Sequence, residues 1–398
     1  MGVRERTMEG KSGDLELYIH IPFCVRKCGY CDFLSFPSDA SAREQYARGL
    51  TEEIKAVSAL MAGREREVSS IYLGGGTPSV MEPQYLESIM KALGEGFTVQ
   101  EGAEISMECN PGTVTGKSLA AFRDLGINRL SFGLQSADDS ELRCLSRIHT
   151  FDQFLENFWE ARKAGFSNIN VDLMSGLPNQ TLQGYERTLQ AVVRLEPEHI
   201  SAYSLILEEG TPFYQTYQSA EAAASLPDED TERQLYWTGR EFLEKEGYVC
   251  YEISNFAKPG KECRHNVGYW TGREYIGLGL GASSLLDGYR FRNTVHMEEY
   301  LTNAPDPQAI RSVEETVTLG RAMEEFAFLG LRMSEGLDET VFQRRFGRPF
   351  ENIYGQTAQR LVTLGLLRRE GTKLRLTHRG IDVSNLVMAE FLLESDIP

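Results

Sequence analysis

The sequence predicts an α/β fold, a partial barrel of six strand–helix units. Apolar runs rich in β-branched and aromatic residues recur along the first half of the chain, with helical stretches between them. Strands that alternate with helices favour a parallel sheet. Eight such units close a barrel, so six units predict a barrel that remains open. We expect strands at 15–22, 69–74, 104–110, 129–135, 168–175 and 199–207, and helices at 40–61, 83–94, 115–125, 151–164 and 181–195.

Cysteine, glycine and polar residues follow these strands at the carboxyl ends, where barrels of this kind place their functional groups. Three cysteines follow the first strand, and the glycine-rich 74–78 follows the second. Glu108 closes the third strand, Gln135 the fourth, and Asp172 lies in the fifth. We therefore expect one functional site at this edge of the sheet.

The pattern changes after the sixth strand, and we expect four parts in all. These are an N-terminal tail at 1–14, the partial barrel at 15–210, an extension at 211–311 and a mostly helical C-terminal domain at 312–398. Within the last part, 365–376 and the apolar helix after it are typical of a winged-helix module.

Composition narrows the class of protein. The chain carries 41 basic and 58 acidic residues, a net charge of −17, which opposes binding to a phosphate backbone. No apolar run is long enough to cross a bilayer, and the polar start has no secretory signal, so we expect a cytoplasmic protein. In that compartment the seven cysteines are expected to be reduced thiols or metal ligands.

Cys24, Cys28 and Cys31 stand at spacings of four and three, flanked by Arg26 and Lys27. The alternatives are a zinc knuckle or three buried thiols, but zinc normally takes paired ligands and a fourth partner. Three thiolates so close in sequence can hold three irons of a 4Fe–4S cluster and leave the fourth iron open to a ligand. The pattern favours the cluster.

Further polar groups lie in or just past apolar strands: Glu108, Gln135, Arg147 and Asp172. One reading is internal hydrogen bonding, for example between Arg147 and Glu108, since buried polar groups need partners. The other is a pocket for a ligand with an amine, a carboxylate and a ribose. Residues 74–76 are glycines, which allow a ligand close to the backbone. The residues themselves leave both readings open.

His265 is the remaining candidate ligand. A lone histidine is usually structural, but Tyr269 and Trp270 beside it offer flat aromatic faces that would suit a macrocycle. Histidine is a common axial ligand of haem iron, and Cys263 is a competing soft ligand.

Several motifs together resemble the radical SAM proteins related to oxygen-independent coproporphyrinogen III dehydrogenase. They are YIHIPFC at 18–24, CxxxCxxC at 24–31, GGGTP at 74–78 and NRLSFGLQS at 128–136. The resemblance covers nearly the whole chain. It implies that Cys24, Cys28 and Cys31 bind a 4Fe–4S cluster whose open iron is chelated by S-adenosylmethionine (SAM), and that reduction of SAM would yield a 5′-deoxyadenosyl radical.

The resemblance also implies a SAM pocket, carried over position by position. Tyr18 corresponds to a residue beside the cofactor, and Gly75, Gly76 and Thr77 to the loop that holds its methionine part. Four further positions correspond to pocket residues: Glu108, Gln135, Arg147 and Asp172.

Three features point within this family to its haem-chaperone group. Phe33 stands where the dehydrogenase has a fourth cysteine, the chain before the first strand is short, and residues 265–270 form an HNxxYW motif. The resemblance implies binding of haem, with His265 as its ligand, and delivery to haem-requiring proteins such as membrane respiratory enzymes. Ser283 stands where many relatives carry a histidine.

Two other functions are weighed against the chaperone. One is a coproporphyrinogen dehydrogenase that works without the fourth cysteine, an activity we do not expect, although other enzyme activity stays open. The other is a DNA-binding regulator using the C-terminal module, which the negative charge opposes. We expect no nucleic-acid partner. A homodimer and peripheral membrane contact through partner proteins both stay open.

Overall fold

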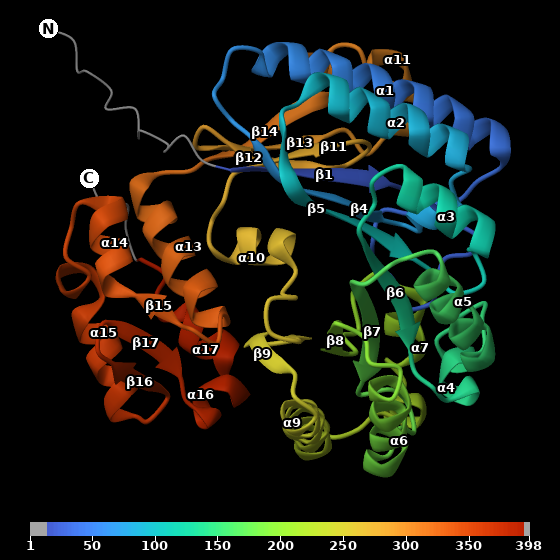
Figure 1. Cartoon of the computed structure of the whole chain (residues 1–398). Coiled ribbons are helices and arrows are strands. Elements are labelled where there is room, and N and C mark those ends of the chain that lie inside the picture. Colours follow the sequence, from blue (N-terminus) through green and yellow to red (C-terminus); the bar gives the residue numbers. More distant parts are fainter. Residues whose placement is uncertain (1–13, 394–398) are drawn as a thin grey trace, which may run out of the picture.

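The computed structural model describes residues 14–393 and confirms the α/β partial barrel (Figure 1). Six parallel strands stand side by side in their order along the chain. They are β1 (Leu15–Ile21), β4 (Val68–Gly75), β5 (Val99–Cys109), β6 (Arg129–Gln135), β7 (Ile169–Ser175) and β8 (His199–Ser204). Most of the expected tail, residues 1–13, lies outside the described residues.

Helices connect these strands and cover the outer face of the sheet. They are α1 (Ala40–Met61), the 3-10 turn η1 (Pro78–Val80), α2 (Pro83–Gly96), α3 (Gly116–Asp124), α4 (Asp139–Cys144), α5 (Phe151–Lys163) and α6 (Leu182–Val193). Thr115 and Thr150 form capping boxes that start α3 and α5. The sequence did not predict α4, because six residues are too few for a helical period to show.

Strand alternation gives the barrel a polar interior. Leu17, Ile19 and Ile21 of β1 point outward and are fully buried in the core under the helices. Glu16, Tyr18 and His20 alternate with them and face the interior. The same alternation holds across the neighbouring strands, so the interior is lined largely by groups that need polar partners.

Residues 211–311 extend the same sheet at both edges. Beyond β8, β10 (Asn255–Ala257) and β9 (Val249–Glu252) add antiparallel strands. Beyond β1, β11 (Tyr275–Leu278) pairs parallel, followed by β12 (Ser283–Leu286), β13 (Tyr289–Asn293) and β14 (Arg311–Thr316). The helices here are α7 (Pro212–Thr216), α8 (Ala220–Ala223), α9 (Glu229–Lys245), α10 (Arg264–Trp270), α11 (Met297–Asn303) and α12 (Pro307–Ile310).

The C-terminal part is mostly helical, as expected, and has a core of its own. Its elements are α13 (Leu319–Arg332), β15 (Leu337–Asp338), α14 (Glu339–Phe346), α15 (Glu351–Thr363), β16 (Leu367–Glu370), β17 (Lys373–Leu376), α16 (His378–Asp382) and α17 (Ser384–Ala389). The expected boundaries between parts stay predictions: the sheet continues past residue 210, and β14 crosses the one at 312. No described helix is long and apolar enough to cross a membrane.

Glu53 on α1 fixes the glycine-rich return that follows β11. Its carboxylate is fully buried and accepts hydrogen bonds from the Gly279 amide at 2.8 Å, from Asn293 Nδ2 at 2.7 Å and from the Tyr300 hydroxyl at 2.7 Å. Three buried donors therefore depend on one side chain.

We expect Glu53→Ala to lower the free energy of unfolding by about 3 kcal/mol, since those donors lose their acceptor inside the core. Denaturant unfolding measures the change. Its neighbour Glu52, exposed and paired only with Lys55, provides the matched control, and Glu52→Ala should cost less than about 0.5 kcal/mol. Equal losses in the two variants would contradict this account.

Candidate functional site

The three motif cysteines lie on one loop at the carboxyl edge of the barrel. Cys24 ends the short strand β2 (Phe23–Cys24), which pairs with β3 (Phe36–Pro37), and Cys28 and Cys31 follow on the loop. All three are free thiols of intermediate exposure. Phe213 of α7 supports the loop: its amide donates to the Gly29 carbonyl at 2.9 Å.

The glycine loop after β4 is bonded directly to this cysteine loop. The amides of Gly76 and Thr77 donate to the carbonyls of Ile21 and Phe23 at 2.8 and 2.7 Å. A side chain on residue 76 would lie 2.7 Å from the Phe23 carbonyl, so only glycine allows this approach. The Thr77 hydroxyl donates to the Cys24 sulfur at 3.4 Å.

Glu108 is hydrogen-bonded to the glycine loop. Its carboxylate accepts from the Gly75 amide and from the Tyr72 hydroxyl, both at 3.0 Å. Burial, with the negative charge of Asp172 nearby, raises the pKa of Glu108 to about 7. Asp172 accepts from Asn170 Nδ2 at 2.7 Å, and burial raises its pKa as well. Two half-buried acids therefore lie close enough for their charges to interact, and neither has a cationic partner among its hydrogen bonds.

Arg147 joins the cysteine loop to strands β5 and β6. Its guanidinium donates to the Cys28 sulfur at 3.5 Å, and also to the Asn110 side chain and the Gly133 carbonyl. The pairing of Arg147 with Glu108 considered from the sequence is not made, because the Asn110 amide oxygen takes the guanidinium instead. Gln135 lies beside this group at the end of β6 with φ +75°, a strained backbone for a residue other than glycine.

Asn110 is bonded into this group of residues, although it was not among the candidates selected from the sequence. Its amide nitrogen donates to the Thr77 hydroxyl at 2.9 Å while its oxygen accepts from Arg147. It therefore links the glycine loop to the arginine. The available signal was its position directly after the third strand, the same signal that selected Glu108.

His265 lies elsewhere, on α10 within the barrel. The ring is 1% exposed, and both nitrogens are hydrogen-bonded, Nδ1 to the Ser70 hydroxyl at 2.9 Å and Nε2 to the Tyr269 hydroxyl at 3.1 Å. Burial and the charges of Arg129 and Arg273 lower its pKa to about 3, so the imidazole is neutral. Ser70 is near the start of β4, whereas the cysteines follow the end of β1.

The structure therefore brings most of the predicted residues together and leaves one apart. Around the cysteine and glycine loops it gathers Cys24, Cys28, Cys31, Gly75, Gly76, Thr77, Glu108, Gln135 and Arg147. Asp172 acts on Glu108 through its charge, and Tyr18 reaches the group by stacking on Tyr72. His265 is outside it, and Ser283 starts β12.

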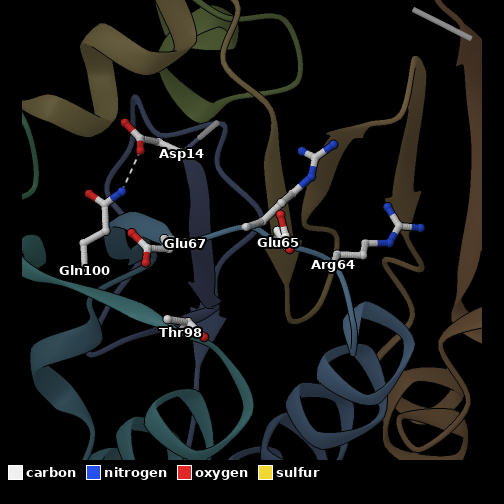
Figure 2. Close-up of a pocket in the computed structure, with 7 residues that line it drawn as sticks. Asp14, Arg64, Glu65, Glu67, Thr98 and Gln100 are labelled. Carbon is white, nitrogen blue, oxygen red and sulfur yellow. Dashed lines mark hydrogen bonds between the residues drawn. The ribbon is translucent and has the colours of Figure 1, made fainter. Parts of the chain in front are cut away.

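A pocket lies at the opposite edge of the sheet, where β1 and β4 begin (Figure 2). Its lining mixes both charges, and Asp14 there accepts from Gln100 at 2.6 Å. Within the described part of the chain, no three His, Cys, Asp or Glu side chains converge as ligands of a single ion would. A 4Fe–4S cluster has another requirement, because each thiolate binds its own iron.

Comparison with known proteins agrees with this layout. Residues 18–192 match the model of the radical SAM superfamily, and residues 317–383 match the HemN C-terminal domain. A protein of Lactococcus lactis called heme chaperone HemW is 34% identical over 95% of this chain and 97% of its own length. The Bacillus subtilis protein of that name is 33% identical over 95% and 99%.

A mitochondrial protein of Bos taurus, radical S-adenosyl methionine domain-containing protein 1, is 37% identical over 94% of this chain and 87% of its own. Among solved structures, coproporphyrinogen III oxidase (HemN) of Escherichia coli superposes with a TM-score of 0.84 over 96% of this chain and 91% of its own. At 24% identity that likeness shows the fold alone. From the full-length identity to its relatives, the chain belongs to the HemW family of the radical SAM superfamily.

Proposed function

We propose that this protein is a haem chaperone, which binds haem and delivers it to haem-requiring acceptor proteins. The observation that carries the proposal is the identity of about one third, over nearly the whole length, to relatives named heme chaperones. Respiratory enzymes are the acceptors we propose. We further propose that Cys24, Cys28 and Cys31 hold a 4Fe–4S cluster and that SAM binds its open iron.

The residues of the carboxyl edge fit these cofactors. Half-buried thiols on one loop suit a cluster, and the Arg147 guanidinium at 3.5 Å from Cys28 would offset the negative charge of bound thiolates. Beside them, the absence of side chains at Gly75 and Gly76 lets the loop that we propose for the methionine part of SAM pack against the His20 ring and the backbone of the cysteine loop. When bound, the cluster would supply an electron to the SAM sulfonium.

Glu108 and Asp172 would supply negative charge that a cationic ligand needs. Burial raises the pKa of both carboxylates, and a bound ammonium or sulfonium would favour their ionised forms. We propose that they bind SAM together with Tyr18, Gly75, Gly76, Thr77, Gln135 and Arg147. Asn110 would hold Thr77 and Arg147 in place.

His265 is the haem ligand in this proposal, and the structure sets a condition on it. An imidazole nitrogen can bind iron only after it gives up its present partner, Ser70 or Tyr269. Because the ring is buried, ligation would also require α10 to move out of the barrel. Haem binding through His265 is therefore proposed to accompany a displacement of this helix.

The second candidate function is coproporphyrinogen dehydrogenation, favoured by the likeness of the fold to HemN. Phe33 opposes this second function, because it stands where the dehydrogenase has a further cysteine. Its side chain is 65% exposed beside the three motif cysteines. We expect reconstituted protein to form no protoporphyrinogen from coproporphyrinogen III, SAM and a reductant without oxygen. Formation of protoporphyrinogen, measured by chromatography, would contradict the proposed chaperone function and support the dehydrogenase.

Loss of one motif cysteine should abolish the cluster. We expect Cys28→Ser, reconstituted anaerobically with iron and sulfide, to lose most of the visible absorbance of an iron–sulfur protein, because a hydroxyl is a poor iron ligand. Cys144→Ser is the matched control, since Cys144 is also half-buried but lies outside the motif on α4, and it should keep the full spectrum. A full spectrum in Cys28→Ser would rule out three-cysteine ligation.

Haem titration tests the chaperone function. The reconstituted protein should bind haem with a stoichiometric Soret change, and His265→Ala should weaken that binding by at least about tenfold, because iron loses its axial ligand. His296, an exposed histidine at the start of α11 whose side chain makes no capping bond, provides the control. Unchanged haem affinity in His265→Ala would show that His265 is not the haem ligand. Absence of haem binding by the native protein would contradict the proposed chaperone function.

A further inference from the structure

Helix α10 is held at both ends by different parts of the chain. At its start the Glu104 carboxylate accepts from the Cys263 thiol at 3.4 Å and from the Arg264 amide at 3.2 Å. At its end the Arg332 guanidinium lies 4.3 Å from the centre of the Trp270 ring, and Arg345 donates to the Thr271 carbonyl at 3.2 Å. Figure 1 shows α10 between the barrel sheet and the C-terminal domain, and it contacts both β4 and α13.

Its His265 ring extends an aromatic stack inside the barrel. The imidazole is stacked on the Tyr72 ring with centres 5.2 Å apart and planes at 22°. Tyr18 stacks on both, at 6.4 Å from Tyr72 and 6.5 Å from His265. Since each ring fills space beside the next, the position of Tyr72 depends on His265 being seated.

Tyr72 in turn reaches the proposed SAM pocket. Its hydroxyl donates to one oxygen of Glu108, and the other oxygen accepts from the Gly75 amide, both at 3.0 Å. Gly75 has φ +108°, so this peptide takes an orientation that few residues adopt. An unbroken series of contacts therefore runs from His265 through Tyr72 and Glu108 to the glycine loop.

We propose that His265 is a positioning residue of the SAM pocket, which holds Tyr72 against Glu108 and so fixes the carboxylate and the Gly75 amide. This inference rests on the SAM site proposed above but not on haem ligation by His265. It has one consequence for that ligation. A ring that is seated in the barrel cannot bind iron, so haem taken by His265 and SAM in the pocket oppose each other.

The test measures SAM affinity in anaerobically reconstituted protein by equilibrium dialysis. We expect His265→Ala to weaken SAM binding by about tenfold, as expected for misplacing one hydrogen-bonded buried carboxylate. His265→Phe restores a ring against Tyr72 and cannot ligate iron, so its SAM affinity should recover toward native while haem affinity stays low. His296→Ala is the surface control, with native affinity for both.

Tyr72→Phe tests the same contacts from the other side and leaves α10 intact. It removes only the hydroxyl that donates to Glu108, so it keeps the aromatic stack and we expect it to fold. We expect about a tenfold loss of SAM affinity here too. Thermal unfolding of each variant establishes that the protein binding SAM is folded.

The pH profile of SAM binding separates positioning from a general loss of structure. Glu108 is faced by Tyr18 on β1, Tyr72 on β4, Asp172 on β7 and the Gly75 amide. With the pKa of Glu108 raised to about 7, affinity for cationic SAM should rise as pH increases through 7 and the carboxyl ionises. Tyr72→Phe and His265→Ala weaken a bond that favours the ionised form, so the rise should move to higher pH.

Different results would contradict the inference and the proposed SAM site. Native SAM affinity and an unshifted pH profile in both His265→Ala and Tyr72→Phe would show that the contacts do not position the pocket. Failure of the native protein to bind SAM at all would instead remove the proposed cofactor site. Haem titration of the same variants, measured in parallel, reports on ligation alone.

Discussion

The structure depends on pairing the polar groups that line an open barrel. Glu16, Glu104 and Arg129 are almost completely buried on strands β1, β5 and β6, and charges in such positions are costly unless they are paired. The strands supply only part of this pairing: the Ser106 hydroxyl of β5 accepts from Arg129 at 3.5 Å and donates to Glu104 at 3.3 Å. Further partners come from the extension that follows the barrel, where Arg273 is 3.3 Å from Glu16 and the start of α10 donates to Glu104.

This requirement explains why the parts of the chain are not independent. His199 in the barrel bonds the Tyr251 hydroxyl at 2.9 Å, and the fully buried Glu252 in the extension pairs with Arg332 of the C-terminal domain at 2.9 Å. On the far side, Trp237 of α9 stacks on His378 of α16. Barrel, extension and C-terminal domain therefore each satisfy groups of the next, and one sheet continues through the first two.

The same polar interior connects the two regions of functional interest. The cysteine and glycine loops occupy the carboxyl edge, and α10 fills the interior near the beginning of β4. Between them lie Tyr72, which stacks on His265, and Glu108, which accepts from both the Tyr72 hydroxyl and the Gly75 amide. A histidine far along the sequence is therefore coupled by packing and hydrogen bonds to the loop proposed to hold SAM.

The sequence by itself determined the features that depend on local pattern. Strand and helix periods gave the six-unit parallel fold, and the spacing of Cys24, Cys28 and Cys31 gave three thiols on one loop, because near neighbours in sequence stay near in space. The positions of Glu108 and Gln135 at the ends of predicted strands indicated that they lie near the cysteines, because parallel strands end at the same edge of the sheet.

Only the tertiary structure decided which groups became partners. Three features join residues that are distant along the chain. Arg147 bonds Asn110 rather than Glu108, and further strands pair beyond β1 and β8. His265 bonds Ser70 and stacks on Tyr72. Such contacts follow from strand register and from the need to satisfy buried polar groups, and neither leaves a local pattern in the sequence.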